Sequence, residues 1–182
     1  MDPLVAHQRA QDAFAGVLAN VRPEQFGDPT PCSEWTIHDL IEHVIGGNER
    51  VVMWSGSSDE PPPRPDDICA AHRASAAAAQ EVFARPDGMS ITFTLPFGEI
   101  PGQMFIGMRT SDVLTHAWDL AVATGQSTNL DPELAAEQLG AVRAFVGPQF
   151  RGSGRPFGDE LPCSSERPPA DQLAAFLGRK VP

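Results

Sequence analysis

Three side chains in this sequence have the types and the spacing of a metal site. Asp112 and His116 are four residues apart, so on a helix they stand one turn apart on the same face. His43 belongs to an earlier segment whose apolar residues also recur at helical spacing. Two neutral imidazoles and one carboxylate form the open ligand set of a catalytic divalent metal, with one position left for water or substrate. We therefore expect a metal at His43, Asp112 and His116, provided that the two helices face each other.

The spacing leaves other interpretations open. An Asp and a His one turn apart are often a simple hydrogen-bonded pair on a helix surface. Two histidines and a carboxylate also match the ligands of Fe(II) oxygenases, and water on a divalent metal is the nucleophile of many hydrolases. A metal-dependent hydrolase or oxygenase is thus one alternative. A helical module that binds a cation without catalysis is another.

Several further residues are candidates for supporting roles. Asp119, one turn after His116, is expected to accept a hydrogen bond from an imidazole or to cap the next helix, although it could also be a fourth ligand. Cys32 lies in a loop flanked by prolines, where a structural thiol is more common than a nucleophile. The candidate walls of a cavity above the metal are Phe97, Met108 and Trp118. The arginines that could pair either with an anionic substrate or with surface acids are Arg109, Arg151 and Arg155.

The elements that must position these residues are mostly helices. Thr36 and Asp39 form a capping box at the start of the helix that carries His43. In the same helix Gly46 and Gly47 predict the close approach of another backbone. The helix that carries Asp112 is apolar on two faces, which predicts neighbours on both sides. The expected helices span about residues 3–20, 36–54, 66–84, 103–124, 132–146 and 170–177, with a short β-ribbon at 91–101.

Composition limits the function classes. The 24 acidic and 13 basic residues give a net charge of −11, which argues against nucleic acid as a partner. Three widely spaced cysteines without a Cys-x-x-Cys pair argue against a disulfide framework and favour a reducing cytoplasm. The sequence has neither an apolar run of about 18 residues nor a basic start followed by an apolar stretch, so we expect no membrane segment. We expect one domain over residues 1–182 and leave a homodimer open.

Three sequence blocks resemble a known family. They are Thr-Pro-Cys-x-x-Trp at 30–35, Leu-x-x-His at 40–43, and Asp-x-x-x-His-x-Trp-Asp-Leu-Ala at 112–121. In this order they are similar to the metal-binding domain of the mycothiol-dependent maleylpyruvate isomerase family, of the DinB-like superfamily. The ribbon around 96–98 and the closing segment 173–179 are also similar. Asp112 stands where the isomerase has Glu.

The resemblance implies a fold, a metal and a chemistry. The fold is an all-α, DinB-like four-helix bundle, with the short β-ribbon as an insertion and a small C-terminal helix. The preferred metal is zinc, with nickel, iron and manganese as alternatives, and the residues that match the family's ligands are His43, Asp112 and His116. The chemistry is transfer or isomerisation through a low-molecular-weight thiol such as mycothiol, with an electrophilic small molecule as the second substrate. A divalent ion with one carboxylate would carry a net charge of +1, which a thiolate neutralises.

Overall fold

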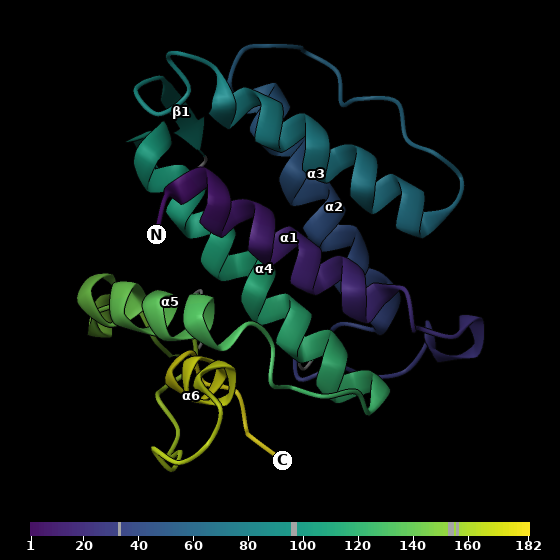
Figure 1. The fold of residues 1–182 in the computed structure, drawn as a ribbon, viewed down its shortest axis with the longest axis vertical. Coiled ribbons are helices and arrows are strands. Elements are labelled where there is room, and N and C mark those ends of the chain that lie inside the picture. The colour runs from purple at the N-terminus through teal and green to yellow at the C-terminus, as the bar shows by residue number, and fades with distance from the viewer. Residues whose placement is uncertain (33, 96–97, 153–154, 156) are drawn as a thin grey trace.

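The computed structural model describes residues 1–32, 34–95, 98–152, 155 and 157–182 (Figure 1). Its four longest helices are α1 (Pro3–Leu18), α2 (Ile37–Trp54), α3 (Ile68–Ala84) and α4 (Gly102–Thr124). Each of them packs against two of the others, α1 against α3 and α4, and α2 against α3 and α4. This arrangement is a four-helix bundle, and it confirms the expected fold class.

Shorter elements complete the structure. Strands β1 (Thr92–Leu95) and β2 (Gly98–Pro101) form an antiparallel ribbon before α4 and contact it. Helices α5 (Pro132–Phe145) and α6 (Pro169–Phe176) pack against each other and against α4, on one side of the bundle (Figure 1). The expected ribbon and C-terminal helix are thereby confirmed. Two single 3-10 turns, η1 (Pro23–Gln25) and η2 (Pro148–Phe150), were not expected from the sequence.

Local sequence signals determine where α2 begins and where α4 ends, and these two helices carry His43, Asp112 and His116. At the start of α2, the Thr36 hydroxyl accepts a hydrogen bond from the Asp39 amide at 3.2 Å, and the Asp39 carboxylate accepts one from the Thr36 amide at 3.0 Å. This is the expected capping box. Helix α4 ends at Gly125, whose φ of 69° is a left-handed conformation that glycine adopts without a Cβ clash. No helix in the described ranges is long and apolar enough to cross a membrane.

Helix α4 is the central element of the core, as its two apolar faces predict. Val113, Leu114, Ala117 and Leu120 are all buried in the main apolar cluster with side chains from α1 and α2. Farther along the molecule, Phe105 packs in a second cluster with residues of α3 and β1. Because most of α4 from Val113 to Ala121 is buried, the polar side chains of this stretch must find partners inside the protein.

A network of polar side chains crosses the bundle core between α1, α2 and α3. Gln11 lies at its centre, donating from Nε2 to Asn48 Oδ1 at 2.8 Å and to His7 Nε2 at 3.2 Å. His7 Nδ1 in turn donates to Gln80 Oε1 at 2.6 Å, and His72 Nε2 donates to Gln11 Oε1 at 3.0 Å. Burial lowers the pKa of His7 and that of His72 to about 4 each. Both imidazoles are therefore neutral in the folded protein at neutral pH.

The two buried histidines should make the fold sensitive to mild acid. Because their pKa is about 4 when folded and about 6.5 when unfolded, the unfolded chain binds more protons between these values. Titration of these two histidines should therefore leave the free energy of unfolding unchanged above pH 6.5. Between pH 6.5 and pH 4 it should decrease by on the order of 2 to 3 kcal/mol for each histidine. Urea unfolding of metal-free protein at several pH values measures this slope.

A His7→Gln/His72→Gln variant, which cannot take up these protons, is the matched comparison. Its free energy of unfolding should depend less on pH in this window than that of the wild type, whatever its stability at pH 7. Parallel slopes for the two proteins would contradict the assignment of neutral buried imidazoles.

Candidate metal centre

The structure brings the three residues of the sequence-based ligand set together. Asp112 Oδ1 lies 3.4 Å from His43 Nε2 and 3.4 Å from His116 Nε2. One ligand atom from each of the three residues lies within 4.8 Å of the other two. His116 is buried, whereas His43 and Asp112 are half-buried, so the group is open to solvent on one side. Helices α2 and α4 face each other here, as the prediction required.

The distances suit an ion better than a direct hydrogen bond. An N–H···O bond in a protein is usually 2.7 to 3.2 Å long, so contacts of 3.4 Å are weak. By contrast, two ligands about 2.0 to 2.1 Å from a tetrahedral zinc ion are about 3.3 to 3.4 Å apart. Both imidazoles also present the same nitrogen, Nε2, to the carboxylate. The three residues therefore fit a divalent metal in type and number, and the two pairs that involve Asp112 have the spacing of zinc ligands.

Charges around Asp112 keep its carboxylate ionised. Burial by itself would raise the pKa of Asp112, but the Arg109 guanidinium and the two imidazoles lower it well below its usual value. For His116, burial opposes the charged form, but the neighbouring Asp112 carboxylate raises the imidazole pKa well above 6.5. Without a metal, His116 therefore keeps its proton at neutral pH, and its imidazolium pairs with the Asp112 carboxylate.

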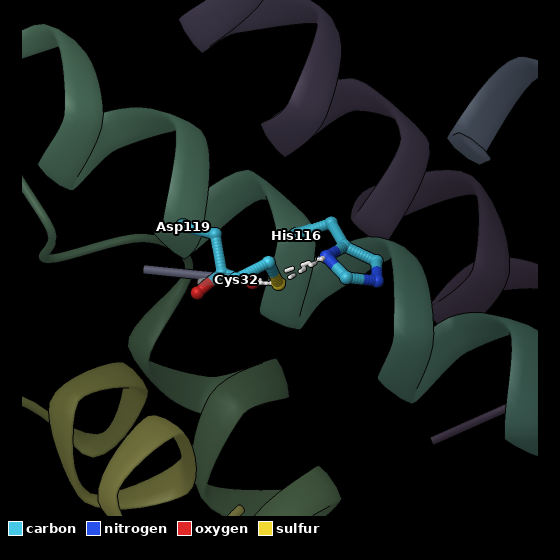
Figure 2. Close-up of side chains that lie close together, drawn as sticks. All are labelled: Cys32, His116 and Asp119. Atoms are coloured by element: carbon cyan, nitrogen blue, oxygen red, sulfur yellow. Dashed lines mark hydrogen bonds and ion pairs between the residues drawn. The ribbon is translucent and has the colours of Figure 1, made fainter. Parts of the chain in front are cut away.

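Asp119 holds the other nitrogen of His116. Its Oδ2 lies 3.0 Å from His116 Nδ1 (Figure 2), and the carboxylate is completely buried. Burial would raise the pKa of Asp119, but His116 and Arg179 lower it. Asp119 accepts the hydrogen of Nδ1 in the imidazolium and also in the neutral ring, and in the neutral ring this leaves the Nε2 lone pair available to a metal. The geometry is the one expected for Asp119 as an orienting group.

Cys32 and Arg179 complete a polar cluster on the Nδ1 side of His116. The Cys32 thiol donates to Asp119 Oδ2 at 3.3 Å and lies 3.9 Å from His116 Nδ1 (Figure 2). Arg179 donates to both oxygens of Asp119, at 3.3 and 3.2 Å, and to Cys32 Sγ at 3.5 Å. Cys32, His116 and Asp119 are close enough to share a metal ion themselves. Because a guanidinium already occupies both carboxylate oxygens, we interpret this cluster as a support for His116.

Sequence reasoning missed the place of Trp35 and Arg179. The ring centroid of Trp35 is 4.6 Å from that of His43 and 5.6 Å from that of His116, so the indole flanks both imidazoles. Trp35 belongs to the Thr-Pro-Cys-x-x-Trp block, which was the available signal for it and for Cys32. Arg179 follows α6, and only the three-dimensional fold brings it to α4.

Two of the expected cavity walls can be checked. Trp118 is buried, and its indole nitrogen donates to Asp171 of α6 at 2.7 Å, so its assignment to a wall above the metal is wrong. Met108 is half-buried, one turn before Asp112 on the same helix face. Phe97 lies outside the described residues.

The structure corrects the expectations for Arg109 and for the glycine pair. Arg109 is neither a surface partner nor free for a substrate, because its buried guanidinium donates to Asp112 Oδ2 at 2.7 Å. This guanidinium, and not a second backbone, occupies the space beside Gly47. Arg151 donates to the carbonyls of Gly158 and Phe176 and lies over the Phe176 ring. Arg155 is exposed.

Comparison with solved structures supports the fold. Two crystal structures of a mycothiol-dependent maleylpyruvate isomerase, one of them a mutant, superpose with TM-scores of 0.61 and 0.59. They are 20% and 21% identical to this chain, and each match covers 77% of it and 67% of the isomerase. At this level of identity the match establishes a shared fold.

Comparison of sequences establishes the family. Two uncharacterized proteins from two strains of Mycobacterium tuberculosis are each 74% identical over 181 residues, which covers 100% of both chains. The profile of the mycothiol maleylpyruvate isomerase N-terminal domain matches residues 7–121, a range that contains His43, Asp112 and His116. The chain therefore belongs to the family of the mycothiol maleylpyruvate isomerase N-terminal domain.

Proposed function

We propose that this protein binds a divalent metal, zinc in the first place, through His43, Asp112 and His116. We further propose that the metal activates a low-molecular-weight thiol such as mycothiol. The thiol would then either be transferred to an electrophilic small molecule or promote the isomerisation of that molecule. We expect this reaction to take place in the cytoplasm. The observation that carries the proposal is a single carboxylate oxygen 3.4 Å from the Nε2 atoms of two imidazoles. The family and the name of the solved isomerase support the thiol.

The charge of the site favours an anionic occupant. A divalent ion with one Asp carboxylate and two neutral imidazoles carries a net charge of +1, and the buried Arg109 guanidinium adds a further positive charge close by. Asp119 and Arg179 compensate each other. When bound, the metal would supply the positive charge that holds a thiol as its thiolate near neutral pH, although a free thiol has a pKa of about 8.5.

The residues around the ligands have separate tasks. Asp119 fixes the ring of His116 and its tautomer by accepting the hydrogen of Nδ1. Trp35 covers the faces of both imidazoles with an apolar surface and so limits the access of water from that side. The half-exposed edges of His43 and Asp112 leave the approach for the thiol and the electrophile.

Replacement of the ligands should remove the metal. Protein purified without added metal should contain about one divalent ion per chain, and His43→Ala and His116→Ala should contain almost none. The control is His38→Ala, which removes an exposed imidazole from the same helix as His43. Elemental analysis of the purified proteins measures the content. Full metal content in either ligand variant would reject the assignment.

Loss of the Asp119 charge should weaken metal binding without abolishing it. Asp119→Asn should lower zinc affinity about 10- to 100-fold, because a neutral amide supports the His116 ring less well than a carboxylate. The control is Asp171→Asn, which changes another buried carboxylate whose partner is Trp118. Zinc titration against a chromophoric chelator gives both affinities. Equal losses in the two variants would show general destabilisation instead of support for His116.

Thiol chemistry should require the metal. Incubation with mycothiol and an electrophile, such as a maleyl compound or a halogenated aromatic, should give a product whose formation stops after chelation and in His116→Ala. An S-transfer is followed by the loss of free thiol and by the mass of the adduct. An isomerisation changes neither the thiol concentration nor the mass, so it is followed by chromatographic separation of the two isomers. Hydrolysis in the absence of thiol would indicate a hydrolase instead. Metal binding with no turnover over a broad panel would indicate a binding module, and either result would contradict the thiol reaction.

A further inference from the structure

The guanidinium of Arg109 fits into a slot that Gly47 leaves open on the surface of α2. A Cβ atom built on Gly47 would lie 2.5 Å from both Cζ and Nη2 of Arg109, far closer than carbon atoms approach other side chains. Any residue other than glycine at position 47 would therefore displace the guanidinium. Gly46 differs, since its added Cβ would first meet the end of the flexible Arg50 side chain at 3.4 Å, an ordinary contact.

From this slot the guanidinium links the two helices that carry the metal ligands. Its Nη1 donates to Asp112 Oδ2 at 2.7 Å. Its Nη2 donates to the Val44 carbonyl at 3.3 Å and to Asn48 Oδ1 at 3.2 Å. Val44 follows His43 directly in α2, whereas Arg109 and Asp112 belong to α4. The position of the Asp112 carboxylate is thereby fixed relative to the helix of His43.

The contact is costly if its only task is to stabilise the fold. Arg109 is 6% exposed, and its Nε has no hydrogen-bond partner among the described residues. Burial of a charge is offset only partly by its ion pair, and such pairs often add little to stability. Asp112 does not depend on this ion pair alone to stay ionised, because its half-buried carboxylate could be hydrated on its open side. The arrangement is better explained by what it does to the carboxylate.

We propose that Arg109, seated in the Gly47 slot, is a positioning residue for the metal ligand Asp112. By occupying Oδ2, it leaves Oδ1 as the oxygen that faces His43 and His116, so the carboxylate binds the metal through one oxygen. One-oxygen binding keeps a coordination position free for the thiol. This inference rests on the proposed metal site, and it adds two residues to that site, neither of which touches the ion.

The test compares two neighbouring glycines of one helix. Gly47→Ala should lower zinc affinity about 10- to 100-fold, as expected when a group that orients a ligand is lost. Gly46→Ala, the matched control, should bind zinc as the wild type does. Arg109→Gln should reproduce the loss. A Gly47→Ala/Arg109→Gln variant should be no weaker than Arg109→Gln alone, because both changes remove the same contact.

A second readout separates positioning from a loss of folding. With Co²⁺ in place of zinc, the visible absorption reports the coordination geometry of the ion. Gly47→Ala and Arg109→Gln should change the Co²⁺ spectrum in the same way, and Gly46→Ala should not. Thermal unfolding of the metal-free variants measures their folding separately, so the affinities are compared only between folded proteins.

The outcomes distinguish this inference from the proposed function. If His116→Ala loses zinc while Gly47→Ala and Arg109→Gln keep wild-type affinity and the wild-type Co²⁺ spectrum, the positioning role is wrong and the metal site stands. Additive losses in the double variant would also overturn it. If the wild type itself binds neither zinc nor Co²⁺, the proposed function fails, and this inference fails with it.

Discussion

The Asp112 carboxylate is the constraint on which the rest of the site depends. One of its oxygens faces the imidazoles of His43 and His116, and the other faces the buried guanidinium of Arg109. A partly buried anion is stabilised by nearby positive charge, and on the Oδ2 side the buried Arg109 guanidinium supplies a permanent one. On the other side the two Nε2 atoms are placed to share a cation with Oδ1. This is why we regard a divalent metal as the natural completion of the contact between α2 and α4.

The site is continuous with the polar interior of the bundle. Arg109 donates to Asn48, and Asn48 is bonded to Gln11, the centre of the network that includes His7 and His72. On the other side of His116, Asp119 and Arg179 extend the hydrogen bonds to the segment after α6. The carboxylate and imidazole of α4 are thus held from both directions by elements far apart in the sequence. Such support gives ligands the fixed geometry that a metal requires.

Much of the fold could be predicted from the sequence, because its signals are local. Apolar periodicity predicted α1 and α2, alanine content predicted α3, and the Pro and Gly residues between segments helped to bound the later helices. Thr36 and Asp39 predicted the start of α2, and alternation predicted the first strand of the ribbon. The one-turn spacing of Asp112 and His116 put two candidate ligands on one face. The meeting with His43 was a hypothesis that only coordinates could test.

The parts that could not be predicted depend on tertiary packing. The pair Gly46 and Gly47 indicated empty space on α2, but not that the guanidinium of Arg109 would fill it. Periodicity also could not predict that Arg179 contacts Asp119. Nor could it predict that Trp118 points toward α6 and away from the candidate metal ligands. The central claim is that a metal ion sits among His43, Asp112 and His116. Anomalous X-ray scattering from crystals grown without added metal tests it directly: the account predicts a peak within bonding distance of all three residues, and a well-ordered site without such a peak would contradict it.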